Sequence, residues 1–329
     1  MNRNEFLKNS GLVALYSFSL GSVYYAYSDW QEKKRQREIA EINNRRYSQK
    51  YNGLSYKFLD LANILGSNQA DRQIIDNIIT RAISNLEPLS VSNSGSFSDR
   101  KEAIKALKTI DDAIHDEGLK TTNDAIRDGK LEKSNNYNII LHEVLKNKVL
   151  DCVSLSVIYY DISKIKNFNL AVVAAPRHVF LKCYLGNDNF NWESLDAKVF
   201  SNDYYRKNPD ISRESEENGV FLKNLTEDEI LSYQYTKIGR RLDELGFKES
   251  LDYFKKAVEL YPKGRDINSN MGLFYYNKGN YKEAIYWYKK AIKLDTKFYD
   301  AYYKLGQSYK QLNNDKEAEF YFNKANSLK

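Results

Sequence analysis

The sequence predicts a protein of the α+β class, in which a domain of helices and a small antiparallel sheet is followed by an all-helical repeat region. Over residues 54–145, apolar residues recur at helical spacing. Over residues 171–193 the pattern changes to alternation, which is typical of strands. From Tyr233 onward, similar residues recur at a fixed interval, which indicates helical repeats. An uncharged stretch over residues 9–28 adds an N-terminal membrane-spanning helix to this prediction.

These patterns divide the chain into four parts. Residues 1–30 are expected to be a transmembrane anchor or a signal segment, and residues 31–50 a charged helical connector. Residues 51–232 form the helix-plus-sheet domain, and residues 233–329 form three helical repeats. The chain has 329 residues, of which 42% are hydrophobic, so both folded parts can have a hydrophobic core.

Composition and charge exclude several classes of function. The net charge of +6 is small for this length and is widely spread, so no nucleic-acid partner is expected. The two cysteines, Cys152 and Cys183, are too few for a disulfide framework. Neither they nor the three histidines have the spacing of a structural zinc site. We therefore expect no bound metal and no cofactor.

The stretch from Asn9 to Ser28 has the length that a helix needs to cross a bilayer. Three tyrosines and Trp30 near its C-terminal end resemble the aromatic belt of a membrane interface. The alternative is an export signal that is cleaved near Ala26-Tyr27-Ser28, where the small residues fit a cleavage site. We favour an anchor that stays in the membrane.

Basic residues on either side of this stretch indicate its orientation. Only Arg3 and Lys8 precede it, and a larger group follows, namely Lys33, Lys34, Arg35, Arg37, Arg45 and Arg46. The positive-inside rule then predicts a single-pass membrane protein whose body lies in the cytoplasm. Free cysteines also favour a reducing compartment. A signal segment would place the body on the other side.

Four amphipathic segments precede the expected strands. Their first apolar residues are Leu54, Ile74, Ala103 and Ile139. The second segment ends before Pro88, because a residue before proline avoids the helical conformation. A serine-rich loop follows, and Ser98 or Asp99 could cap the third segment.

The C-terminal period has the residue types of tetratricopeptide repeats, whose paired helices approach closely where the side chain is small. The matching pairs are Gly272 and Gly306, Gly279 and Asn313, Ala284 and Ala318, Tyr288 and Phe322, and Ala291 and Ala325. An earlier repeat has Ser250, Phe254 and Ala257 at the corresponding positions. Three repeats are about the minimum that bury a continuous core.

Such repeats form a concave groove that can bind a protein or peptide partner. The expected groove residues are Leu273, Tyr276, Tyr303 and Gln307. They mix aromatic and polar side chains, and the two-lysine, two-asparagine set that clamps a terminal carboxylate is not evident. The groove therefore indicates a protein partner without naming it.

One cysteine has a position that suits nucleophilic chemistry. Asp151 can cap a helix whose inner face includes Leu155, so Cys152 falls in the first turn. There the helix dipole and free N–H groups favour a thiolate and could hold the oxyanion of a tetrahedral intermediate. An ionised Asp151 close to the sulfur atom would instead disfavour the thiolate.

A nucleophilic thiol needs a base, and the base needs a group that orients it. His178 opens one expected strand, and the next segment carries Glu193 and Asp196. If a two-residue turn at 186–187 joins the strands, His178 and Glu193 share one face and Asp196 points the other way. Only a loop of odd length reverses this choice. We therefore predict Cys152, His178 and Glu193 as the catalytic residues.

The other cysteine and histidines have simpler interpretations. The alternation places Cys183 on the face opposite His178, so it is expected in the core. His115 lies among acidic residues in a helix and is expected to be solvated. His142, beside two leucines, is expected to be a helix residue with its hydrogen bonds satisfied.

Four segments in this order, CVSLSVIYYDISK, PRHVFLKCY, FNWESLD and GVFLKNLTEDEIL, resemble bacterial transglutaminase-like proteins with C-terminal tetratricopeptide repeats. The family motif is a Cys that opens a helix, a Pro-x-His-x-Phe strand and an Asn-x-Glu strand. Its counterparts here are Cys152, Pro176, His178, Phe180, Asn191 and Glu193. The resemblance covers roughly residues 140–329 and implies a papain-like fold. Leu150 stands where the family often has glycine, and no substrate is implied.

Two functions follow from these patterns. The first is a membrane-anchored cysteine acyl-transfer enzyme, such as a peptidase, amidase or transglutaminase, whose repeats bind a partner or the substrate. The second is a catalytically silent scaffold that acts in protein–protein interaction through its repeats. The two are compatible, because the repeats could select what the thiol modifies.

Overall fold

In the computed structural model, the unit that carries the folded elements begins at Gly53. The structure describes residues 53–86, 97, 99–128, 140–207 and 211–328. The expected membrane segment at 9–28 and the connector at 31–50 lie outside these residues. Across the described ranges, no helix is both long enough and apolar enough to span a bilayer.

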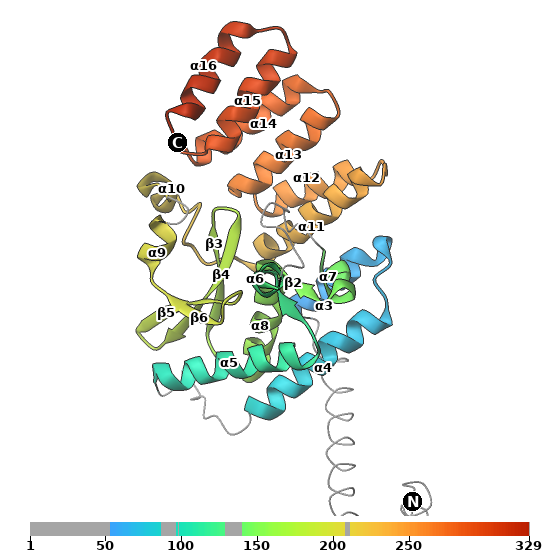
Figure 1. The fold of residues 1–329 in the computed structure, drawn as a ribbon, viewed down its shortest axis with the longest axis vertical. Coiled ribbons are helices and arrows are strands. Elements are labelled where there is room, and N and C mark those ends of the chain that lie inside the picture. Colours follow the sequence, from blue (N-terminus) through green and yellow to red (C-terminus); the bar gives the residue numbers. More distant parts are fainter. Residues whose placement is uncertain (1–52, 87–96, 98, 129–139, 208–210, 329) are drawn as a thin grey trace, which may run out of the picture. The chain divides into compact units, whose positions relative to one another are not determined.

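A group of helices precedes the sheet in this unit (Figure 1). They are α3 (Leu54–Leu61), the 3-10 turn η2 (Ala62–Leu65), α4 (Gln69–Leu86), α5 (Arg100–Asp116), α6 (Thr122–Arg127), α7 (Leu141–Asn147) and α8 (Cys152–Lys166). The central helix is α8, which contacts α3, α4 and α5 as well as the sheet. Asp99 caps α5 by accepting a hydrogen bond from the Glu102 N–H (2.8 Å), as expected from the sequence.

A buried carboxylate ties the first helix to the central one. Asp161 of α8 accepts hydrogen bonds from the N–H groups of Leu54 and Ser55, both at 2.8 Å. These are donors that the start of α3 would otherwise leave unpaired. A Cβ atom at Gly53 would lie 2.5 Å from Asp161 Oδ2, so only glycine fits this approach.

The sheet is an antiparallel meander in the order β3-β4-β5-β6. Its strands are β3 (Leu170–Ala175), β4 (His178–Leu185), β5 (Asp188–Glu193) and β6 (Lys198–Phe200). Leu185 pairs with Asp188 across a two-residue turn, in which Gly186 has a φ of 61°. The register expected from the sequence is therefore confirmed.

A second, parallel ladder joins β1 (Lys120–Thr121) to β2 (Val149–Leu150). The sequence pattern does not predict it, because strands of two residues have no alternation to detect. Leu150 pairs with Thr121 and is fully buried. The ladder therefore anchors the chain just before α8 begins.

Short helices α9 (Asn202–Lys207) and α10 (Arg213–Glu217) lead to three helical hairpins. The hairpins consist of α11 (Glu227–Glu244) with α12 (Ser250–Leu260), α13 (Arg265–Asn277) with α14 (Tyr281–Leu294), and α15 (Tyr299–Gln311) with α16 (Asp315–Asn326). In each, a glycine of the first helix packs under an aromatic ring of the second, pairing Gly239 with Phe254, Gly272 with Tyr288 and Gly306 with Phe322. An added Cβ atom would lie 2.8 Å from the ring in the last two pairs. The expected close packing at small residues is therefore confirmed.

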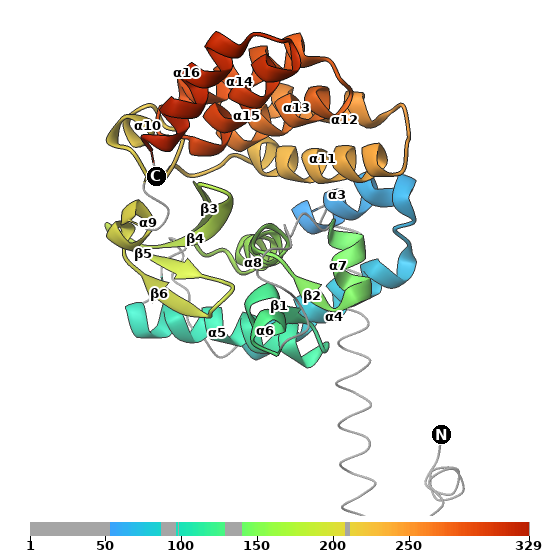
Figure 2. The same cartoon turned by 45° about the horizontal axis from the view of Figure 1, so that its top comes forward.

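The helix α11 belongs to both regions. It contacts α3 on one side and α12 on the other (Figure 2). Ile238 and Leu242 of α11 are buried together with Ala62 and Ile140 of the helix-plus-sheet domain. The repeats therefore continue the core of that domain through α11.

Candidate active site

Cys152 is the first residue of α8, in the first turn as the sequence predicts. The side chain of Asp151 accepts a hydrogen bond from the Ser154 N–H (2.8 Å), and its carbonyl accepts one from Leu155 (2.9 Å). Within the described residues, no hydrogen bond uses the N–H groups of Cys152 and Val153. These two groups are free to donate to an oxygen atom beside the thiol.

Asp151 also forms a buried ion pair with Lys237 of α11. The two side chains are only 4% and 5% exposed. The lysine charge offsets the negative charge of Asp151, which by itself would disfavour a thiolate at Cys152. The pair joins residues 86 positions apart, and hydrophobic periodicity does not predict it. The only hint of this ion pair in the sequence is that Lys237 stands next to Ile238, which faces the core.

The structure brings His178 and Glu193 together. His178 begins β4 and Glu193 ends β5, and the Nε2 atom of His178 lies 2.7 Å from Glu193 Oε2. Both side chains lie on one face of the meander, as the expected register requires. The carboxylate of Asp196 instead accepts a hydrogen bond from Asn123 Nδ2 (2.9 Å).

Two further donors fix the Glu193 carboxylate. The Leu195 N–H donates to Oε1 (3.2 Å), and the Tyr205 hydroxyl donates to Oε2 (3.1 Å). The ring of Tyr205 stacks on Phe180 with 3.8 Å between the centroids. Burial, together with the Glu193 charge, raises the pKa of Tyr205 well above its ordinary value, so the hydroxyl keeps its proton. Tyr205 lies on α9, and no sequence pattern links it to the site.

The second ring nitrogen of His178, Nδ1, takes no part in the contact with Glu193. Burial lowers the pKa of His178, but Cys152 and Glu193, through charge and hydrogen bonds, raise it well above its ordinary value. A protonated imidazole places a positive charge beside the sulfur atom of Cys152. The His178 side chain is 23% exposed and Cys152 is half-buried, so a ligand can reach both.

The repeats hold the turn that precedes His178. Arg177 has a φ of 57°, a left-handed conformation that costs a residue with a side chain roughly 1–2 kcal/mol. Its N–H donates to Asp266 of α13 (2.7 Å), and its guanidinium donates to Asp300 of α15 (3.2 Å). Asp266 also accepts a hydrogen bond from the buried Arg265 (2.7 Å). Two repeat helices therefore fix the backbone beside the candidate base.

Cys152 and His178 line a cavity of about 430 Å³. The repeats supply much of its wall from α11, α13, α14 and α15, including Tyr233, Arg240, Asn270, Leu273, Tyr288, Tyr303 and Lys304. Of the four expected groove residues, Leu273 and Tyr303 line this cavity, whereas Tyr276 and Gln307 do not. The thiol and part of the repeat surface therefore share one space.

The remaining cysteine and one histidine lie outside the cavity lining. Cys183 is fully buried, as expected, and burial raises its pKa to about 12. His142 Nδ1 lies 2.8 Å from Asp71 Oδ2, so its expected hydrogen bonding is confirmed. Among the described residues, no cluster of histidine, cysteine or acidic side chains is placed to hold a metal ion.

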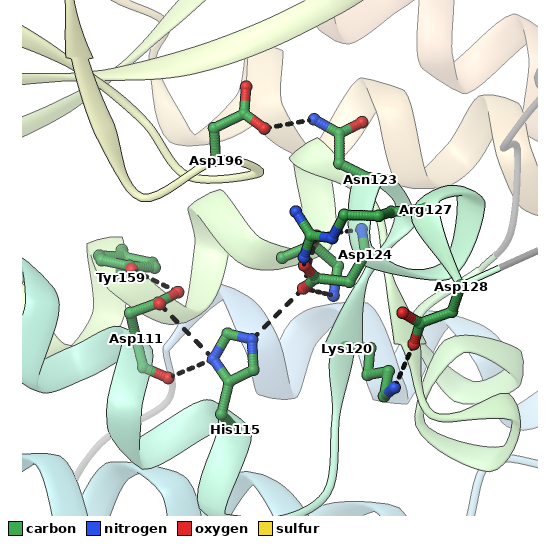
Figure 3. A network of polar contacts seen from close by, with 10 residues as sticks. Asp111, His115, Lys120, Asn123, Asp124, Arg127, Asp128, Tyr159 and Asp196 are labelled. Carbon is green, nitrogen blue, oxygen red and sulfur yellow. Dashed lines mark hydrogen bonds and ion pairs between the residues drawn. The ribbon is translucent and has the colours of Figure 1, made fainter.

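His115 is exposed, as expected, but two acidic residues also hold it (Figure 3). Its Nδ1 lies 2.9 Å from the Asp111 carbonyl oxygen, and its Nε2 lies 3.4 Å from Asp124 Oδ2. Asp111 in turn accepts a hydrogen bond from the Tyr159 hydroxyl of α8 (3.3 Å). This network links α5 to α6, whose first residue, Thr122, lines the cavity.

Comparison with known proteins finds matches for the repeats. Family models described as "TPR repeat" and "Tetratricopeptide repeat" match residues 272–313 and 299–329. Among curated proteins, no sequence matches this chain.

Solved structures also resemble part of the chain. A crystal structure of MamA is 27% identical over 30% of this chain and 57% of its own, with a TM-score of 0.28. This chain therefore spans little more than half the length of MamA. The second TPR of Spaghetti (RPAP3), bound to the HSP90 peptide SRMEEVD, is 17% identical over 31% of this chain and 95% of its own (TM-score 0.29). The N-terminal domain of stress-induced protein-1 from C. elegans is 18% identical over 32% and 88% (TM-score 0.30).

The helical hairpins, their glycine–aromatic contacts and the two family models agree. The C-terminal region of this chain consists of tetratricopeptide repeats, and these repeats supply a surface for protein–protein interaction.

Proposed function

We propose that the chain is a cysteine-dependent acyl-transfer enzyme whose helix-plus-sheet domain is of the transglutaminase-like, papain-fold type. Cys152 is the nucleophile, His178 the base and acid, and Glu193 the group that orients the imidazole. One observation carries the proposal: Cys152 and His178 line the same cavity, while Glu193 holds the Nε2 atom of the imidazole. The position of Cys152 at the start of the central helix also supports it.

In the first half of the reaction, the Cys152 thiolate forms a bond to the carbonyl carbon of an amide or ester. The carbonyl oxygen becomes an oxyanion, to which the N–H groups of Cys152 and Val153 are available as donors. His178 gives its proton to the leaving amine or alcohol as the bond to that group breaks. The product of this half is a thioester on Cys152.

In the second half, water or an amine attacks the thioester. His178 takes a proton from the attacking group, and the thiolate leaves. Glu193 keeps the imidazole in one orientation through both halves, and Tyr205 holds Glu193. Water as acceptor makes the enzyme a peptidase or amidase, and an amine makes it a transglutaminase.

The repeats bind the protein or peptide that carries the acyl group. Support comes from the shared cavity, because Leu273 and Tyr303 of the repeats line the same space as Cys152. Contacts made by the remote parts of a substrate can then position its reacting carbonyl at the thiol.

Labelling of the full chain with iodoacetamide tests the activated thiol. At about pH 6, Cys152 should react faster than a free cysteine, whose pKa is about 8.5, because the imidazolium favours its thiolate. Incubation with p-nitrophenyl acetate should leave an acetyl group on Cys152, detected by mass spectrometry, and the Cys152→Ala variant should carry none. A Cys152 that reacts no faster than free cysteine and stays unacylated contradicts the proposal.

The second candidate function is a catalytically silent scaffold. It is favoured by the Tyr303 side chain, which is 40% exposed on the repeats and can contact a partner without any chemistry. Deletion from residue 233 onward is an unsuitable test, because it removes Ile238 and Leu242 from the core. If the protein is a scaffold, Tyr303→Ala should lose its bound partners in pull-down experiments. Cys152→Ala should keep its bound partners and also its function in the cell. Loss of function in Cys152→Ala alone contradicts a pure scaffold.

We further propose that residues 9–28 anchor the protein as a single membrane pass with its body in the cytoplasm. The support is the uncharged length of this stretch and the basic residues that follow it. Alkaline extraction should leave the full chain in the membrane fraction and release a variant without residues 1–30. Protease added on the cytoplasmic side should digest the body, and protection of the body contradicts this orientation.

A further inference from the structure

The cavity carries more positive charge than its own acidic residues balance. Three carboxylates line it, and each already has a cationic partner. The pairs are Asp151 with Lys237, Asp266 with Arg265, and Asp300 with Arg177. No carboxylate of the described cavity lining is therefore left for a further cation.

Two further cations line the same cavity. Arg240 on α11 is half-buried and forms no ion pair within the described residues, although the charge of Glu244 acts on it. Burial lowers the pKa of the Arg240 guanidinium, which reflects the cost of holding this charge away from water. Lys304 on α15 is also half-buried, and its ammonium group lies over the ring of Tyr276, 5.7 Å from the ring centroid.

A third polar group of the wall lacks a partner. Tyr288 is fully buried at the cavity, and its hydroxyl has no hydrogen-bond partner among the described residues. Because that oxygen is itself shielded from solvent, leaving it unpaired costs about 1–3 kcal/mol. Leu273 and Tyr303 add apolar contact area to the same wall.

We infer that this cavity binds an extended acidic peptide segment, whose Asp or Glu side chains pair with Arg240 and Lys304. The inference rests on the proposed function in one respect, because it names the substrate class of the acyl-transfer site. An Arg guanidinium binds a carboxylate through two parallel hydrogen bonds, and a lysine binds it as a point charge.

The placement of the two cations favours side-chain carboxylates over a single terminal carboxylate. Arg240 and Lys304 come from α11 and α15, and α13 contacts both of these helices. Packed helices lie about 8–10 Å apart, so two carboxylates several residues apart match the two cations better than one terminus does. The acyl group that reacts then lies within or beside an acidic stretch.

Fluorescence anisotropy with the full chain tests the inference. The probes are labelled twelve-residue peptides with an amidated C-terminus, one alternating Glu with Ser, one with Gln in place of Glu, and one with Lys. A fourth peptide has the Gln sequence and a free terminal carboxylate. The anisotropy measurements use the Cys152→Ala variant, so that binding is read without any reaction.

The Glu peptide should bind, and binding should weaken with salt because it depends on charge. Arg240→Gln should weaken it about tenfold or more, and Lys304→Gln less. The matched controls are Arg241→Gln, which removes the next arginine on α11, and Lys282→Gln on α14; both lie outside the cavity lining and should leave binding unchanged. In the chain with Cys152 intact, the Glu peptide should also protect the thiol from iodoacetamide.

Equal binding of the Gln and Glu peptides, or Glu-peptide binding that Arg240→Gln leaves intact, overturns the inference. Tight binding of only the peptide with a free C-terminus also overturns the inference, because Arg240 and Lys304 would then bind a terminal carboxylate. If Cys152 is unreactive but peptide binding still depends on Arg240, the acyl-transfer function is refuted and the inferred binding of an acidic peptide is retained. The two failures are therefore distinguishable.

Discussion

Two regions of this molecule hold a histidine against a carboxylate in nearly the same way. At the cavity, His178 Nε2 lies 2.7 Å from Glu193. In the helical layer, His142 Nδ1 lies 2.8 Å from Asp71. His178 lines the cavity and interacts with the Cys152 thiol, whereas His142 and Asp71 lie outside the cavity lining. A carboxylate orients an imidazole in either setting, so what distinguishes the candidate base is the Cys152 thiol that interacts with it.

The two carboxylates also differ in their other partners. Glu193 has donors in addition to His178, namely Leu195 N–H and the Tyr205 hydroxyl. Asp71 accepts one other hydrogen bond, from the Asn68 N–H (2.9 Å). Glu193 is therefore held in place independently of His178, whereas Asp71 depends on His142 for half of its hydrogen bonds among the described residues.

The largest expected difference between the two pairs is in thiol reactivity. We expect His178→Ala to lower the rate of Cys152 alkylation at about pH 6 by roughly tenfold to a hundredfold, because the thiolate loses its imidazolium partner. His142→Ala is the matched control and should leave the rate unchanged. The measurement is iodoacetamide labelling followed by mass spectrometry of the Cys152 peptide.

Equal rates in the two variants would remove the distinction between the pairs. His178 would then be a structural histidine like His142, and the scaffold function would be the better one. A slow rate in both variants would point to loss of folding, which circular dichroism of the same samples detects.

The second expected difference is in stability, where His142→Ala should have the larger effect and His178→Ala the smaller one. His142→Ala leaves the Asp71 carboxylate, whose side chain is 8% exposed, with one donor, so we expect a loss of about 2 kcal/mol in the free energy of unfolding. His178→Ala should cost less than about 1 kcal/mol, because Glu193 keeps two donors. Urea denaturation of both variants measures the difference, and an equal or larger loss in His178→Ala contradicts this account.

Local patterns predicted the parts of the site that depend on short stretches of chain. The choice of Glu193 over Asp196 needed only the two-residue turn at 186–187 and the alternation of a strand. The first-turn position of Cys152 needed only a capping Asp151. The repeats needed only a period, because each unit packs mainly on its neighbours.

Contacts between distant segments could not be predicted in this way. Lys237 neutralises Asp151 from a helix that the sequence assigns to the repeats, and Tyr205 reaches Glu193 from a short helix after the sheet. Asp266 of α13 fixes the turn before His178. The contacts of Lys237 and Asp266 depend on how the repeats pack on the helix-plus-sheet domain, and the contact of Tyr205 depends on how α9 folds back on the sheet. Hydrophobic periodicity carries no information on either packing.

A smaller effect tests whether the partners of Glu193 matter to the candidate base. Tyr205→Phe removes one hydroxyl donor and keeps the ring that stacks on Phe180. We expect Cys152 alkylation to slow about fivefold, the equivalent of roughly 1 kcal/mol, since Glu193 holds the imidazole less firmly. The free energy of unfolding should change little. Tyr204→Phe, which removes a hydroxyl from the adjacent tyrosine, serves as the control. Equal rates in both variants contradict a positioning role for Tyr205.

The smallest expected effect concerns His115, the third histidine, which has acidic partners but no thiol. Burial lowers its pKa, but hydrogen bonds and charge from Asp111 and Asp124 raise it more, to above the ordinary value. A raised folded-state pKa stabilises the fold below about pH 6.5, and this contribution is lost as the pH rises through the folded-state value. Because the side chain is 39% exposed, solvent screening limits the contribution to about 0.5 kcal/mol.

Titration of the His115 imidazole by NMR should give a midpoint above that of free histidine, and Asp124→Asn should lower that midpoint. A midpoint that Asp124→Asn leaves unchanged would show that the contact in Figure 3 does not act on the charge of His115.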